Sequence, residues 1–366
     1  MNQAAHPMPT SDRVFWIDFI RASAAIMVIV LHAGSPYLSR PGRFPEWQWN
    51  TILAVEAWIQ VSVPLFFMIS GFLFLKKETV AFVRPIKRAT AALLFYTAVA
   101  MVYNATLKDI PASETLNSFL YAKPFYHLWF FYPLIGVYAI FYFMKPRFEL
   151  GWMGALAVLV VMCFIGSGTQ SLFAHYINKS SRIFLDGTFI IYLLYAFLGF
   201  YLATTNGLSR RATVAVFCAL IVNTAAIAIF TKEATTASGK TFTLYYQYQS
   251  PLVIIGSAMT FLLLREIAQL IIRTTYVRNA VTYISRFSLG IFGLHAFILD
   301  YLRFHTGLGL FSQDSLLHVL YMSAFTLVLS LTIARGLLFL DRWGPFVSNG
   351  HPAAPRKGLP SKVLAN

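Results

Sequence analysis

An arginine and a histidine flank the first long apolar run of the chain, in the stretch RASAAIMVIVLH. His32 follows Arg21 by eleven residues, which make three helical turns plus about 20°, so both would share one helix face, about 16 Å apart along the axis. Asp18, three residues before Arg21 on that face, can pair with it. Singly, Arg21 could reach the membrane interface and His32 could be a satisfied polar residue. Aligned on one face, the three residues predict a functional groove.

The chemistry open to this groove is proton transfer by histidine. His32 suits a general base because the unperturbed imidazole pKa of about 6.5 leaves it neutral and basic. The sequence contains no GxSxG, HExxH, Walker or GxGxxG motif, and Cys163 and Cys218 lie in apolar runs without metal-ligand spacing. We therefore expect neither a nucleophilic serine nor a zinc mechanism, and no metal cofactor.

Three cations occur at helical spacing in FVRPIKRA, after the second apolar run. Arg84, Lys87 and Arg88 could hold an anionic ligand, of which a phosphate is the obvious candidate. The alternative is the ordinary excess of positive charge on cytoplasmic loops. That excess explains why the cations are present but not why they are so closely spaced.

Histidines occur in two later segments, FYHLWFFY and ISRFSLGIFGLH. His127 lies between Tyr126 and Trp129, whose rings are typical of the aromatic belt at a membrane interface. We expect His127 near the depth of His32. For His295 we favour a buried neutral histidine that hydrogen-bonds to a neighbouring helix.

The composition indicates the elements that must position these residues. Of 366 residues, 58% are hydrophobic and only 12% are charged, against about 25% charged in soluble domains. The net charge of +15 would suit nucleic acid in a soluble protein, but here the basic residues lie mostly between apolar runs. We therefore predict an all-α integral membrane protein whose partner is the lipid bilayer, not nucleic acid.

Ten apolar runs are candidate spans. They cover about residues 15–38, 52–75, 89–107, 127–144, 151–167, 188–204, 212–230, 250–272, 283–303 and 316–340. With the N-terminus inside, 20 of the 29 Lys and Arg residues fall on the inner side, so both termini should be cytoplasmic. We expect one transmembrane domain over residues 1–344 and a disordered cytoplasmic tail over 345–366.

The segment SVPLFFMISGF in the second run carries Pro64 and a Ser70-Gly71 pair. These residues predict a kink and close helix packing. A structural role is therefore the simplest reading of Ser70.

Five of these segments, in this order between residues 16 and 297, resemble the signatures of the acyltransferase 3 family of membrane-bound O-acyltransferases. WIDFIRASAAIMVIVLH is similar to the family's first-helix motif, and SVPLFFMISGF, FYHLWFF and ISRFSLGIFGLH to other signatures. FVRPIKRA is similar to its basic Arg-x-x-Arg motif. There this chain has Lys87 at the second arginine, or uses Arg88 one place late.

This resemblance implies ten or so helices around a central channel, in a bacterial cytoplasmic membrane. It implies transfer of an acetyl or other short acyl group from cytoplasmic acyl-CoA to a hydroxyl of a surface glycan or its polyprenyl-linked precursor. We expect acetyl-CoA as the donor, with succinyl or another short acyl group as the alternative. The matching functional positions are Arg21, His32, Arg84, and Lys87 or Arg88. With that reaction, His32 would act as general base, Asp18 on the same helix face would be a further catalytic residue, and His127 could stabilise the oxyanion. A covalent acyl-histidine intermediate is the alternative to direct transfer.

The competing hypothesis is a transporter. Asp18, Arg21, His32 and His295 would then line a proton or solute path. Against it, no inverted repeat is visible and the cations cluster at one mouth.

Overall fold

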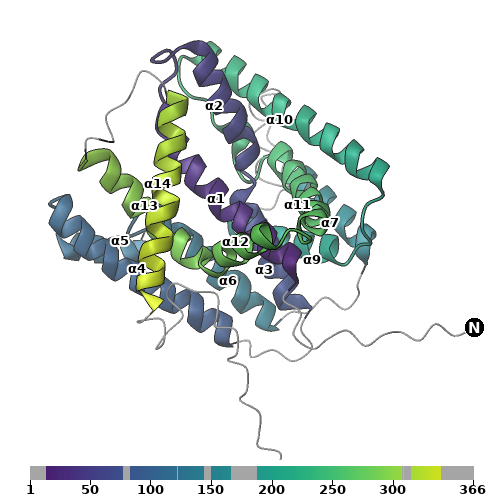
Figure 1. The fold of residues 1–366 in the computed structure, drawn as a ribbon, viewed down its shortest axis with the longest axis horizontal. Helices are drawn as coiled ribbons and strands as arrows, with labels where there is room; N and C mark the ends of the chain where they lie inside the picture. Colours follow the sequence, from purple (N-terminus) through teal and green to yellow (C-terminus); the bar gives the residue numbers. More distant parts are fainter. Residues whose placement is uncertain are drawn as a thin grey trace, which may run out of the picture.

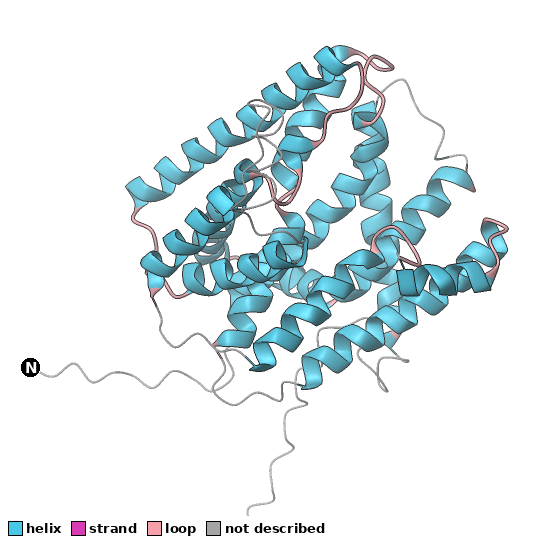
Figure 2. Ribbon diagram, turned by 180° about the vertical axis from the view of Figure 1, so that it is seen from behind, coloured by secondary structure: helices cyan, strands magenta, loops and turns pink. Residues whose placement is uncertain are grey.

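The computed structural model describes residues 14–76, 83–121, 123–143, 150–165, 188–306, 308 and 315–338. Every regular element in these ranges is helical, as Figures 1 and 2 show from opposite sides. The elements are α1 (Phe15–Leu38), α2 (Glu46–Ile59), α3 (Ser62–Leu75), α4 (Val83–Leu107), α5 (Ala112–Tyr121), η1 (Leu128–Phe130), α6 (Phe131–Phe143), α7 (Gly151–Ile165), α9 (Thr188–Ala203), α10 (Arg210–Ser238), η2 (Leu244–Tyr246), α11 (Pro251–Ile271), α12 (Thr275–Arg286), α13 (Ser288–Phe304) and α14 (Ser315–Gly336). The predicted all-α class is confirmed, whereas the tail 345–366 lies outside the described residues.

Helix α1, which carries Asp18, Arg21 and His32, is the central helix of the bundle (Figure 1). It packs against α2, α3, α11, α12, α13 and α14. Small residues on this helix, among them Ala24 and Ala25, are fully buried and let the neighbours approach closely. A polar face on this helix is therefore enclosed by protein.

Within the described residues, six helical segments are long and apolar enough to cross a membrane, and the bent pair α12–α13 makes a seventh if it counts as one span. Shorter apolar helices cover Leu128–Tyr142, Gly151–Cys163 and Phe189–Ala203, where three of the predicted spans lie. A multi-pass membrane protein follows from these lengths. The count of ten spans and the cytoplasmic side of both termini remain predictions.

Two predicted spans are not continuous helices. The span predicted at 283–303 breaks at Phe287, where α12 and α13 meet at 70°. The reason is that α12 is amphipathic: Val281 and Ser285 are buried against the bundle, while the side chains of Tyr276 and Arg278 are exposed. In the second span, helix α2 ends before α3 begins, and Pro64 lies in the first turn of α3, where a missing N–H costs no hydrogen bond. The chain breaks between α2 and α3 at Gln60 and Val61, and Gln60 is the residue whose carbonyl would otherwise accept from position 64.

The predicted close packing at Gly71 is present where α3 crosses α9. A Cβ on Gly71 would lie 1.9 Å from the carbonyl oxygen of Ala196, and one on Gly199 would lie 2.2 Å from that of Met68. The two backbones therefore touch, and this fixes the position of α3. Phe66 and Ser70 of α3 line the cavity described next.

Candidate active site

A cavity of about 340 Å³ lies among α1, α3, α4, α6 and α13. Its charged lining consists of Arg21 from α1 and Arg84 and Arg88 from α4. The remaining described lining residues are Phe66, Ser70, Leu73, Phe74, Pro85, Ala89, Phe130, Phe131, Leu134, Tyr138, Ser288, Leu289 and Phe292. The cavity thus combines a basic part, suited to an anion, with an aromatic part, suited to an apolar group.

The basic part of the cavity is held by Asp18. Arg21 Nη1 lies 3.8 Å from Asp18 Oδ1, which confirms the predicted pairing of these two residues. Ser285 Oγ of α12 donates a hydrogen bond of 2.6 Å to the same carboxylate oxygen. Asp18 lies about 21 Å from His32 along α1 at 1.5 Å per residue. Its place is therefore beside Arg21, too far from His32 to act on the same reacting atoms.

The register of the basic motif on α4 follows from the cavity lining. Arg84 and Arg88 are four residues apart on one helix face, and both line the cavity. Lys87 is exposed and does not belong to the described lining. Of the two candidates for the second cation of the motif, the structure brings Arg88 to the cavity.

A hydroxyl pair from α3 and α6 lies in the cavity wall. Tyr138 donates a hydrogen bond of 3.1 Å to Ser70 Oγ, and both residues line the cavity. Ser70 therefore has a polar contact beside the arginines in addition to its place next to Gly71.

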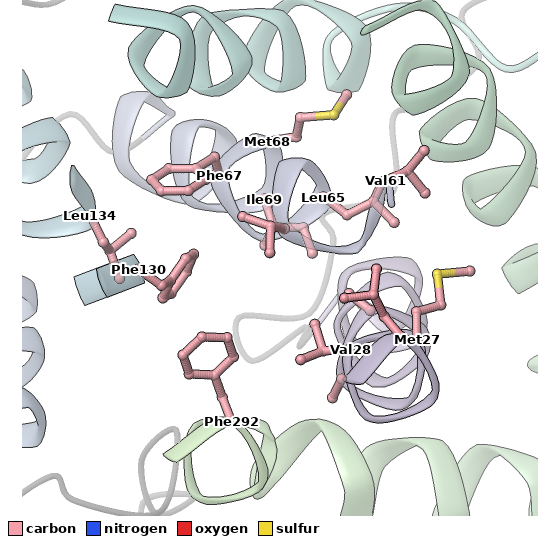
Figure 3. Packing of buried hydrophobic residues seen from close by; sticks show 14 of the residues in the cluster. Met27, Val28, Val61, Leu65, Phe67, Met68, Ile69, Phe130, Leu134 and Phe292 are labelled. Carbon is pink, nitrogen blue, oxygen red and sulfur yellow. The ribbon is translucent and has the colours of Figure 1, made fainter. Parts of the chain in front are cut away.

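Three phenylalanine rings form the boundary between the cavity and the histidines. The ring centroid of Phe130 lies 4.6 Å from that of Phe292 and 6.0 Å from that of Phe66. Figure 3 shows Phe130 and Phe292 pointing toward one another from η1 and α13. On the far side, the Phe292 ring lies 5.9 Å from His127 and 5.6 Å from His295.

Beyond this phenylalanine trio, His32, His127 and His295 form one cluster. The ring of His295 stacks on His32 with 5.2 Å between centroids, and it meets the edge of His127 at 5.1 Å. They come from α1, the turn before η1, and α13. In the described part of the chain this cluster has no geometry that could hold a metal ion. The sequence placed His127 near the depth of His32, and it grouped His295 with His32 only under the transporter hypothesis.

Backbone carbonyls fix the tautomers of two of these histidines. His127 Nε2 lies 3.0 Å from the carbonyl oxygen of Gly293, and His295 Nδ1 lies 3.2 and 2.7 Å from those of Ile291 and Phe292. Carbonyl oxygens only accept, so these nitrogens carry the protons. The other nitrogens, Nδ1 of His127 and Nε2 of His295, are buried without a hydrogen-bond partner among the described residues.

This arrangement has two consequences for the predicted roles. His295 bonds to carbonyls of its own helix, not of a neighbouring helix as predicted. Neutral His127 uses its only N–H on Gly293, so it has no donor left for an oxyanion. Each of the two histidines instead presents a lone pair, which can accept a proton.

The Tyr126 side chain lies beside His32 and carries a hydroxyl. Its ring meets the edge of His32 with 5.2 Å between centroids. Its hydroxyl is buried, and no described residue hydrogen-bonds to it. A buried hydroxyl without a hydrogen-bond partner destabilises the folded protein, and such a hydroxyl is suited to bind an oxygen of a substrate.

Trp129 lies in a different group. Its ring is 5.6 Å from Tyr192 and 5.8 Å from Tyr248, both half-buried or buried. Neither this group nor the phenylalanine trio is predictable from the sequence, because aromatic residues make up 16% of the chain and occur in most apolar runs.

Comparison with known proteins gives one match. The family model described as an acyltransferase domain, of the acyltransferase 3 type, matches residues 14–335. No curated protein and no solved structure matches the chain. The matched range includes every residue of the cavity and of the histidine cluster.

Proposed function

Because the chain belongs to the acyltransferase 3 family, we propose that it is a membrane O-acetyltransferase. It transfers an acetyl group from cytoplasmic acetyl-CoA to a hydroxyl of a cell-surface glycan or its polyprenyl-linked precursor. The observation that carries this proposal is the arrangement of the cavity: arginines at one part, a phenylalanine boundary, and three histidines directly behind it.

Acetyl-CoA has the two chemical features that this cavity combines. Its phosphates are anionic and would pair with Arg21, Arg84 and Arg88. Its pantetheine arm is long, flexible and largely uncharged, and would follow the cavity toward the phenylalanine trio. The distance of about 16 Å between Arg21 and His32 along α1 suits that arm. The thioester would then arrive at the histidine cluster.

The chemical step is a direct transfer of the acetyl group from the sulfur of CoA to the oxygen of the acceptor hydroxyl. His32 takes the proton of the acceptor hydroxyl while the hydroxyl oxygen attacks the thioester carbonyl carbon. The Tyr126 hydroxyl donates a hydrogen bond to the oxyanion that forms on the carbonyl oxygen. The C–S bond then breaks, and the leaving CoA thiolate takes the proton from His32. His127 and His295 each keep one ring nitrogen without a proton. Neither imidazole therefore brings a positive charge next to His32 while His32 takes the proton of the acceptor.

The acceptor side of the proposal rests on resemblance and on aromatic residues. The segments SVPLFFMISG, FYHLWFF and SLGIFGLHA resemble the O-acetyltransferase of the enterobacterial common antigen, which favours a surface polysaccharide precursor as acceptor. Trp129 and Tyr248, which are partly exposed, offer ring faces of the kind that stack on sugars.

We place the protein in the bacterial cytoplasmic membrane with ten crossings and both termini inside. The shorter apolar helices α6, α7 and α9 would complete the ten. The excess of Lys and Arg on the inner side supports this orientation. In it, the arginines of the cavity face the cytoplasm, where acetyl-CoA is made.

Binding of acetyl-CoA to the purified protein tests the proposal. The wild type should bind acetyl-CoA, and the double variant Arg84→Gln/Arg88→Gln should bind it at least about tenfold more weakly, because each charged contact contributes more than 1 kcal/mol. Lys87→Gln, on the same helix but outside the cavity, should change the affinity by less than about twofold. A transporter gives no reason for such binding. A wild type without affinity for acetyl-CoA would exclude the proposed enzyme.

A further inference from the structure

A proline lies four residues after His32 in the same helix. Pro36 is inside α1 and has no backbone N–H, so it cannot donate the hydrogen bond that the carbonyl of His32 would otherwise accept. A carbonyl oxygen that is left without a donor in the interior of a membrane protein is strongly unfavourable. The carbonyl that lacks its helical hydrogen bond is therefore that of His32, the residue proposed as the base.

Arg303 supplies the missing hydrogen bond. This residue is in the last turn of α13, and its Nη2 donates to the carbonyl oxygen of His32. The same nitrogen also lies 3.2 Å from the carbonyl oxygen of Ala33. One guanidinium thus binds two successive carbonyls at the point where α1 lacks its own hydrogen bond.

Helix α13 therefore contacts His32 at two places, its side chain and its backbone. The His295 ring stacks on the imidazole, and Arg303 binds the backbone of the same residue. Asp300, one turn before Arg303, is engaged elsewhere: Lys108 Nζ lies 3.0 Å from it and Tyr103 donates to it at 2.8 Å. The carboxylate closest in sequence to Arg303 is thus neutralised by another cation.

We propose that Arg303 is a positioning residue that fixes the His32 imidazole by binding the carbonyl freed by Pro36. This inference rests on the proposed function, in which His32 is the base. A backbone turn that is held on one side only can rotate its side chain by an ångström or more. Displacements of that size are enough to reduce a catalytic rate greatly. Arg303 acts through His32 and does not itself touch the reacting atoms.

The test is a double-mutant cycle between Arg303→Gln and Pro36→Ala in the purified full-length protein. Alanine at position 36 restores the N–H, so the His32 carbonyl regains a donor within α1. Arg303→Gln alone should lower kcat on the order of 10- to 100-fold with little change in KM for acetyl-CoA. In the Pro36→Ala background the same change should lower kcat by less than about threefold. An equal loss of kcat in both backgrounds would overturn the proposal.

Thermal unfolding gives a readout that does not depend on activity. Arg303→Gln should lower Tm by several degrees in the wild-type background and by clearly less in the Pro36→Ala background. The reason is that the His32 carbonyl loses its hydrogen-bond donor only where Pro36 is present. If the wild type transfers no acetyl group, the proposed function fails. The Tm cycle still decides whether Arg303 replaces the hydrogen bond that Pro36 cannot donate to the His32 carbonyl. Equal Tm losses in both backgrounds would refute it.

Two further variants keep the test decisive. Arg303→Lys keeps a charged donor on a side chain of nearly the same length, whereas the amide of glutamine is uncharged and too short to reach the carbonyl, so Arg303→Lys should keep clearly more kcat than Arg303→Gln. If Pro36→Ala does not fold, equal kcat in these two Arg303 variants overturns the proposal. Arg265 is the matched control: it is buried in α11, and its guanidinium donates to the carbonyls of Leu202, Thr205 and Asn206. Arg265→Gln should lower Tm by the same amount with and without Pro36. If the Tm loss of Arg265→Gln also shrank in the Pro36→Ala background, the smaller loss of Arg303→Gln there would not be specific to the His32 carbonyl, and the proposal would fall.

Discussion

Gly71→Ala tests whether the contact between α3 and α9 sets the shape of the donor cavity. The added Cβ would lie 1.9 Å from the carbonyl oxygen of Ala196, 2.4 Å from its carbonyl carbon and 2.7 Å from its Cα. All three are backbone atoms, so no side-chain rotation can relieve the overlap. The helices must separate instead.

The size of the effect follows from these distances. Ordinary contact at a Cβ begins near 3.4 Å, so the two backbones must move apart by about 1.5 Å. Overpacking of a tight core costs about 1–3 kcal/mol, and a clash with backbone belongs at the upper end of that range. About 3 kcal/mol corresponds to a fall in Tm of roughly 5–10 °C. Because α3 also carries Phe66 and Ser70 of the cavity wall, affinity for acetyl-CoA should fall as well.

Thermal unfolding of the detergent-solubilised protein measures this effect. Gly336→Ala is the control, because a Cβ there would meet no atom within 4 Å and the residue ends helix α14. Alanine is the better helix former, so this variant should match or slightly exceed the wild type in Tm. A Gly71→Ala protein that unfolds within about 2 °C of the wild type would refute the close contact.

Three further variants test individual roles. Tyr126→Phe removes only the unpaired hydroxyl beside His32 and should lower kcat by about 10²-fold with KM unchanged, as steady-state kinetics would show; an unchanged kcat excludes Tyr126 as the oxyanion donor. Phe130→Ala removes one ring of the phenylalanine trio and should raise the rate with butyryl-CoA relative to acetyl-CoA by about tenfold, since each added methylene is worth about 1–3 kcal/mol in a pocket. An unchanged ratio of the two rates in a competition assay contradicts a boundary at this ring. Asp18→Asn should raise KM for acetyl-CoA severalfold and leave kcat nearly intact, because Asp18 holds Arg21; a selective loss of kcat would instead support a catalytic carboxylate.

Local helix geometry made part of the site predictable. The face shared by Asp18, Arg21 and His32 depends only on the helical period, and the Asp18–Arg21 pair follows from it. The same holds for the tight packing at Gly71, which small residues make possible. These features are encoded within one helix or at one residue.

Contacts between distant segments were not predictable. The period of α4 cannot decide between Lys87 and Arg88, because that choice depends on how α4 is rotated against α1 and α3. His295 joined the cluster through the bend at Phe287, which directs α13 toward α1. Nothing in the sequence connects Arg303 with His32, although Pro36, four residues after His32, already required a donor from another helix.

The central claim is that His32 is the base for acetyl transfer from a donor bound in the basic cavity. The most direct measurement follows radiolabelled acetyl from acetyl-CoA to lipid-linked glycans, with wild type and His32→Ala purified and reconstituted in vesicles. We predict that His32→Ala lowers transfer by about 10²–10⁴-fold while its affinity for acetyl-CoA stays within about twofold of wild type. Near-normal transfer by a folded His32→Ala protein would contradict the account.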